Sequence, residues 1–100
     1  MHARVSTLQS PADKFAEGEQ ILQTEIAPKV KEMDGNRGMI ALVDRASGKT
    51  IAITLWDSED AMRASEEQAN QVRAEAASAS SGEIASVERF DVSIFDVTGR

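Results

Sequence analysis

The sequence predicts an α+β domain with the element order β-α-β-β-α-β and a four-stranded antiparallel sheet. Three observations lead to this prediction. Strand-like runs stand at both ends of the chain and in its middle, the two middle runs are joined by a hairpin signal, and two long stretches repeat apolar residues at helical spacing. The chain has 100 residues, enough for a single domain over residues 1–100. This order of elements is the ferredoxin-like, split βαβ arrangement.

The first third of the chain predicts a strand followed by a long helix. Residues 2–8 alternate loosely in polarity, which is typical of a strand. Ser10 can cap the helix that follows at about residues 11–34. Pro28 predicts a kink, or a break into two helices, near Ala27, because it lacks the N–H of a helical hydrogen bond. Gly35 ends the helix in the left-handed conformation. The apolar residues that share one stripe are Phe15, Leu22, Ile26, Val30 and Met33.

The middle of the chain predicts a β-hairpin with two apolar faces. Strands at about residues 37–44 and 49–56 are joined by the loop 45–48, so that Asp44 lies opposite Lys49. One face carries Ile40, Leu42, Ile51, Ile53 and Leu55, and the other carries Met39, Ala41, Val43, Ala52, Thr54 and Trp56. One layer of helices covers only one face. We therefore expect a second copy of the chain to cover the other face, as a homodimer.

The last third predicts a second helix at about residues 58–80 and a strand at about 84–96. The buried stripe of this helix consists mostly of small residues and buries little area per turn. The acidic side chains of both helices are expected to face water, and they include Glu17, Glu19, Glu25, Glu59, Glu66 and Glu67.

Composition excludes several classes of function. The net charge is −6 and the basic residues are scattered, which argues against a nucleic-acid surface. The chain has no cysteine, and no spacing of Asp, Glu and His is typical of a metal site. The longest apolar run, residues 39–43, is too short to span a membrane, and the N-terminus has no apolar signal segment. We expect a cytoplasmic protein with no membrane partner and no bound metal.

Two stretches resemble the antibiotic biosynthesis monooxygenase-like family of dimeric α+β barrels. They are residues 38–44 and residues 51–61, the latter with a strand-ending Trp followed by Asp-Ser-Glu-Asp. The order of elements resembles that family over residues 2–96. The resemblance implies that the sheets of two subunits form a barrel and that each subunit holds a pocket between its helices and its sheet. Members of the family oxidise polyphenolic intermediates without metal or flavin, open the haem ring, or act as isomerases.

The resemblance also implies site residues. Ser6 stands where the haem-degrading branch keeps an Asn, and Arg4 lies on the same face. Residues 62–75 lack the Trp and His of that branch, so haem is not expected. We expect a monooxygenase without a cofactor, acting on a small aromatic or enolisable molecule. Arg4, Ser6 and Trp56 are the expected catalytic residues, and the expected ligand-binding residues are Met39, Thr54 and Met62.

Plainer roles remain open for these residues. Trp56, Met39 and Met62 are also consistent with a filled core, and the lone His2 with a solvated residue. Asp91 is the default base because Tyr is absent, and it could form either a polar cluster with Arg4 and Arg89 or an ion pair at the rim of the barrel. Two other functions are therefore kept: a non-catalytic ligand-binding or structural dimer, and an isomerase.

Overall fold

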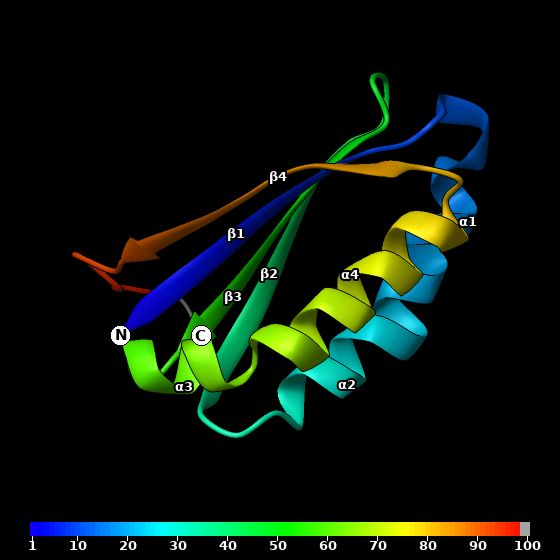
Figure 1. The fold of residues 1–100 in the computed structure, drawn as a ribbon. Coiled ribbons are helices and arrows are strands. Elements are labelled where there is room, and N and C mark those ends of the chain that lie inside the picture. Colours follow the sequence, from blue (N-terminus) through cyan, green and yellow to red (C-terminus); the bar gives the residue numbers. More distant parts are fainter. Residues whose placement is uncertain (99–100) are drawn as a thin grey trace.

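The four strands form one antiparallel sheet in the order β2-β3-β1-β4 in a computed structural model, which describes residues 1–98. The strands are β1 (His2–Gln9), β2 (Asn36–Asp44), β3 (Lys49–Trp56) and β4 (Glu83–Asp91). The helices that follow β1 and β3 lie on the same side of this sheet (Figure 1). The sequence-based prediction of a ferredoxin-like α+β fold is confirmed.

The hairpin has the predicted register. Asp44 pairs with Lys49, Ile40 with Ile53 and Ala41 with Ala52. Gly48 has a φ of +78°, a left-handed conformation that the tight turn requires. Because successive side chains of a strand point to opposite faces of the sheet, this register determines which of them face the helices.

The first helical region is more irregular than the predicted helix with a kink or break near Ala27, although α2 does begin at Ala27. It consists of the 3₁₀ turn η1 (Ala12–Lys14), α1 (Phe15–Ile21), the π-helical turn η2 (Leu22–Ile26) and α2 (Ala27–Lys31). Pro28 lies in the first turn of α2, where its missing N–H costs little. The prediction that Ser10 caps the helix is wrong, because its hydroxyl donates to the hydroxyl of Ser80, 2.7 Å away. Gly35 has the predicted left-handed φ, +80°.

The second helical region is divided at Ser65 into α3 (Glu59–Ala64) and α4 (Glu66–Ala79), where a single helix was predicted. Ser58 caps α3, its hydroxyl accepting from the N–H of Ala61 at 3.1 Å. The carbonyl of Met62 accepts from the Ser65 hydroxyl at 2.7 Å and from Arg4 Nη2 at 2.6 Å. These two bonds occupy the carbonyl that a continuous helix would pair with the N–H of Glu66.

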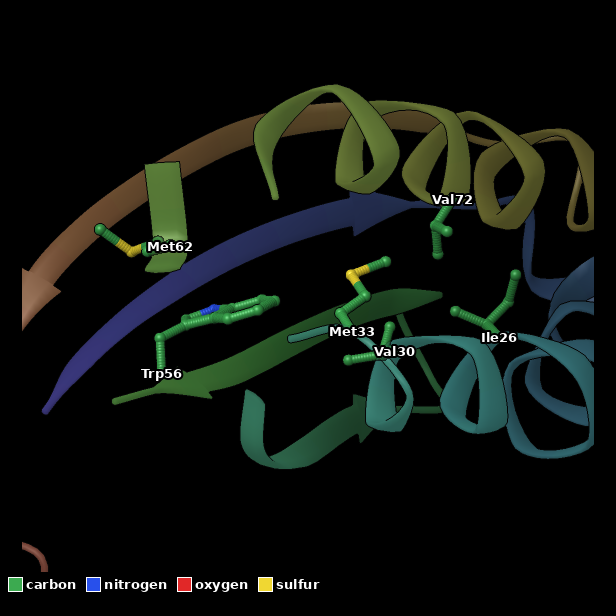
Figure 2. Packing of buried hydrophobic residues seen from close by; sticks show 6 residues of the cluster. All are labelled: Ile26, Val30, Met33, Trp56, Met62 and Val72. Carbon is green, nitrogen blue, oxygen red and sulfur yellow. The ribbon is translucent and has the colours of Figure 1, made fainter. Parts of the chain in front are cut away.

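The last strand ends at Asp91, five residues earlier than the prediction of 84–96. The main hydrophobic cluster lies between the helices and the sheet and contains Ile26, Val30, Met33, Trp56, Met62 and Val72 (Figure 2). None of the helices among residues 1–98 is long and apolar enough to cross a membrane.

The sheet face opposite the helices carries large apolar side chains in contact with water. Ile40 is 44% exposed, Leu42 is 50% exposed and Phe90 is 49% exposed. Leu42 pairs with Ile51, and Ile40 pairs with Ile53, so they form a continuous apolar surface. We call this surface of Ile40, Leu42, Ile51, Ile53 and Phe90 the outer face.

Candidate functional site

A cavity of about 70 Å³ lies between the sheet and the helices. Such a volume holds several water molecules, because one water needs about 10–15 Å³. The apolar part of its wall comes from η2, α2 and α4 and includes Leu22, Ile26, Val30 and Val72. Ala52 and Thr54 of β3 form its floor, and their small side chains leave the space open.

Arg4 is the central polar group of the cavity wall. It lies on β1, is 2% exposed, and its guanidinium carbon lies 5.3 Å from the centre of the Trp56 ring. Nη2 donates to the Met62 carbonyl at 2.6 Å and the Ser65 hydroxyl at 3.0 Å, and lies 3.0 Å from Glu66 Oε2. Nε is buried and has no hydrogen-bond partner among the residues described. One donor of a buried cation in the cavity wall is therefore unsatisfied.

Glu66, the first residue of α4, contacts both Arg4 of β1 and Arg89 of β4. Arg89 donates to both of its carboxylate oxygens, from Nε at 2.8 Å and from Nη2 at 2.7 Å. Mainly through these bonds, and also through Arg4, the pKa of Glu66 is lowered to about 2. Glu66 was predicted to face water, and this prediction is wrong because its side chain is only 27% exposed.

Arg73, on α4, is a second cationic residue of the cavity wall. It is 9% exposed and donates from Nη2 to the side-chain oxygen of Asn70. Burial, and then the nearby Arg4, lower the pKa of Arg73. Sequence reasoning missed this residue, because a charged residue beside the buried stripe of an amphipathic helix usually faces water.

Trp56 is fully buried, and its ring extends into the space between the sheet and the helices (Figure 2). The indole N–H donates to the Thr54 hydroxyl at 2.9 Å, so this donor already has a partner. The Thr54 hydroxyl keeps its own hydrogen for another acceptor. Trp56 therefore offers the cavity its ring face, and Thr54 offers a donor.

The other predicted site residues divide into two groups. Ser6 and Met39 line the cavity together with Arg4, Thr54 and Trp56. Met62 does not line it: its side chain is in the core and points away from the other five residues in Figure 2. Met62 takes part instead through its backbone carbonyl, which accepts from Arg4.

Asp91 lies outside the cavity wall. Its carboxylate is 2.7 Å from His2 Nε2 and its side chain is 88% exposed. Of the two alternatives for Asp91, the cluster with Arg4 and Arg89 is therefore wrong, because Glu66 is the carboxylate that joins the two arginines. Asp91 instead forms an exposed pair, and its partner is His2. His2, predicted as solvated, is 24% exposed in its pairing with Asp91.

The hairpin loop closes the far end of the cavity against α1. Arg45 donates to both carboxylate oxygens of Glu19, at 2.6 and 2.9 Å, and its guanidinium lies 5.9 Å from the centre of the Phe15 ring. Phe15 and Glu19 line the cavity. The hydrogen bonds from Arg45 lower the pKa of Glu19, which was also predicted to face water but has a side chain only 18% exposed.

The residues present do not fit haem or a protein-bound metal. The single histidine, His2, does not line the cavity, and residues 1–98 contain no group of three His, Asp or Glu side chains that could hold a metal ion.

No known protein-family profile matches the chain. Two uncharacterised proteins of Mycobacterium tuberculosis are similar to it. One is 36% identical over 73 residues and the other is 34% identical over 94 residues. The alignments cover 73% and 94% of this chain but 33% and 39% of those proteins, so the chain spans little more than a third of their length.

Solved structures with the same architecture come from several bacteria. The haem degrader MhuD of M. tuberculosis has a TM-score of 0.75 at 22% identity, and 98% of this chain and all of that one are covered. SnoaB, a cofactor-independent oxygenase of Streptomyces nogalater, has a TM-score of 0.70 at 18% identity and 94% coverage of both chains.

A third structure is a monooxygenase of Streptomyces coelicolor in complex with nanaomycin D. Its TM-score is 0.73 at 12% identity, with 98% of this chain and 92% of that one covered. The chain therefore has the fold of the antibiotic biosynthesis monooxygenase-like proteins.

Proposed function

We propose that the chain is a cofactor-independent monooxygenase that oxidises a small aromatic or enolisable molecule in this cavity. The observation that carries the proposal is the pairing of a mainly apolar cavity with a buried guanidinium, Arg4, whose Nε has no partner among the residues described. SnoaB, which has the same fold, is a cofactor-independent oxygenase, and this supports the proposal.

The chemistry needs an electron-rich carbanion, because the substrate itself must supply the electrons that reduce dioxygen. Loss of a proton from an enolisable CH₂ group gives an enolate, whose negative oxygen accepts from Arg4 Nε. Ser6 and Thr54 supply hydroxyl donors, and the Trp56 ring packs on the flat substrate. Overall, the CH₂ carbon loses two hydrogens and gains one oxygen atom, while the second oxygen atom leaves as water.

The cavity offers no strong base for this proton. Glu66 has a pKa of about 2, and Glu19 is held by Arg45 with a lowered pKa. A carboxylate with such a low pKa accepts a proton poorly at neutral pH. The substrate must therefore be acidic enough to release its proton to water once Arg4 stabilises its anion.

Oxygen consumption with an anthrone tests this function. We expect purified protein to consume one dioxygen per anthrone and to form the corresponding anthraquinone. Arg4→Lys keeps a cation but loses Nε, and we expect at least a tenfold lower rate. Trp56→Phe keeps an aromatic ring, and we expect a loss of several-fold.

Arg63→Ala is the matched control, because Arg63 is 72% exposed, pairs with Glu59 and does not line the cavity. Its rate should equal that of the wild type. Near-UV circular dichroism of each variant checks that it is folded. Equal rates for folded Arg4→Lys, Trp56→Phe and Arg63→Ala would contradict the proposed roles.

Two alternatives give different results in the same assay. An isomerase changes its substrate without consuming oxygen. A non-catalytic ligand-binding or structural dimer leaves the anthrone unchanged beyond the rate without protein. The apolar cavity supports all three functions, and the unpartnered Arg4 Nε favours the two that handle an anion.

We also propose that two copies bury their outer faces against each other as a homodimer. The exposed Leu42 and Phe90 support this, because contiguous apolar patches on a sheet are rarely left in water. In analytical ultracentrifugation, Leu42→Glu should change the sedimenting species from a dimer to a monomer. Arg37→Glu is the control, because the side chain of Arg37 is also exposed, at 57%, and this variant should remain a dimer. Sedimentation of the wild type as a single subunit would contradict the dimer.

A further inference from the structure

The end of the cavity beside Trp56 carries more positive charge than the protein compensates. Arg4 and Arg89 share one carboxylate, Glu66, at 3.0 and 2.7 Å. Arg73 lies close enough to Arg4 and Arg89 that, after burial, their charges lower its pKa. Three cations against one anion leave two positive charges. This local excess contrasts with the net charge of −6 for the whole chain.

Arg89 is not the source of the excess. Both of its contacts go to the two oxygens of Glu66, and its side chain is 43% exposed, so water also screens it. Glu66 also lies 3.0 Å from Arg4 Nη2, so it neutralises part of the charge of Arg4 as well. The remaining positive charge is therefore shared by Arg4 and Arg73, which are 2% and 9% exposed and both line the cavity, and the described residues give Arg73 no carboxylate contact.

Neither buried arginine is fully satisfied by the described part of the chain. The only side-chain partner of Arg73 there is the neutral amide of Asn70, and Arg4 Nε has none. A buried cation without a counter-charge is costly. An anion that enters the cavity removes this cost, because it meets both guanidinium groups in mainly apolar surroundings.

We infer that the cavity selects ligands that carry an anionic oxygen, held jointly by Arg73 and Arg4 Nε, on an otherwise apolar ring. This inference rests on the proposed function in taking the cavity as the ligand site, and it deepens it by naming the substrate class. The anionic oxygen belongs either to a carboxylate or to an enol acidic enough to be ionised at neutral pH. An enol that is already ionised also needs no base in the cavity, and the cavity has no effective one.

Matched ligand pairs test this inference without any mutation. The first pair is 1-naphthoate and its neutral amide, and the second is 2-hydroxy-1,4-naphthoquinone, an ionised enol at neutral pH, and its neutral methyl ether. Trp56 is the only tryptophan and lies in the cavity wall, so its fluorescence reports occupancy. We expect the charged member of at least one pair to bind at least tenfold more tightly than its neutral partner.

Variants assign the preference to Arg73. Arg73→Gln should reduce the ratio of charged to neutral affinity to about one, Arg73→Lys should keep most of it, and the exposed Arg63→Gln should leave it unchanged. If Arg73→Gln does not fold, the wild-type ratios and Arg73→Lys still decide: equal binding of charged and neutral ligands by the wild type, or a folded Arg73→Lys that loses the preference although it keeps a cation, would contradict the inference.

The possible results separate the two proposals. Equal binding of charged and neutral ligands would overturn this inference and leave the cavity as a ligand site. Binding of none of the four compounds would overturn both. If only naphthoate is preferred over its neutral partner, the anionic group of the ligand is a carboxylate; if only the hydroxyquinone is preferred, it is an enolate. An unchanged preference in folded Arg73→Gln would overturn the role of Arg73.

Discussion

Replacement of Glu66 by Gln should destabilise the protein far more than a comparable change elsewhere on α3 and α4. The carboxylate of Glu66 faces Arg4 at 3.0 Å and holds Arg89 with two hydrogen bonds. Arg89 is 43% exposed, so the loss of its pairing costs less than about 1 kcal/mol. Arg4 is 2% exposed, and removing the partner of a buried charge costs about 3–5 kcal/mol.

The expected total lies at the low end of that range. The Met62 carbonyl and the Ser65 hydroxyl continue to accept from Arg4, and the Gln side chain keeps one acceptor oxygen. We therefore expect Glu66→Gln to lower the free energy of unfolding by about 3 kcal/mol. The control is Glu59→Gln, in an exposed ion pair with Arg63, which should cost about 0.5 kcal/mol or less.

Urea unfolding followed by circular dichroism measures both variants, at one protein concentration because a dimer's stability depends on it. Since the pKa of Glu66 is lowered from 4.5 to about 2 in the folded protein, its ionisation stabilises the fold above pH 4.5. This contribution is lost as the pH falls through about 2. The difference between wild type and Glu66→Gln should shrink over that range. Equal costs for Glu66→Gln and Glu59→Gln at pH 7 would refute the reasoning.

Two further substitutions test the packing around the cavity. Gly18→Ala should lower the free energy of unfolding by about 1–3 kcal/mol, because the new Cβ would lie 2.4 Å from Cβ of Ser80, where α1 meets the end of α4. An unchanged melting temperature would contradict this close approach. Ser65→Ala should lower the free energy of unfolding by about 1–2 kcal/mol, because Arg4 loses one acceptor and the Met62 carbonyl loses the Ser65 hydroxyl as a donor at the break between α3 and α4. If urea unfolding shows no loss of stability, the break does not depend on this hydroxyl.

The fold was largely predictable because its signals are local. The hairpin register follows from a four-residue loop, and the helix start at Ser58 follows from a capping residue before acidic residues. The apolar stripe from Phe15 to Met33 also has the predicted burial at four of its five positions. The π-helical turn at Leu22–Ile26 has no comparable signal in the sequence, since the same apolar spacing suits an α-helix.

The candidate site was only partly predictable because its polar contacts join distant segments. Arg4 and Glu66 are 62 positions apart, and nothing near Glu66 in the sequence distinguishes it from the acidic residues that face water. Arg73 resembles any charged residue of an amphipathic helix until α4 is placed over the sheet. Thr54 and Trp56 were found because strand alternation puts them on one face of the hairpin, and Ser6 was found through the family resemblance.

The most direct test of the central claim is a crystal structure of the protein soaked with 1-naphthoate. The claim is that the cavity between the sheet and the helices holds a flat, anionic ligand. We predict electron density for the ring beside Trp56 and Val72, with the carboxylate within hydrogen-bond distance of Arg73 or Arg4 Nε. A cavity that contains only water, with the ring bound on the outer face instead, would contradict the claim.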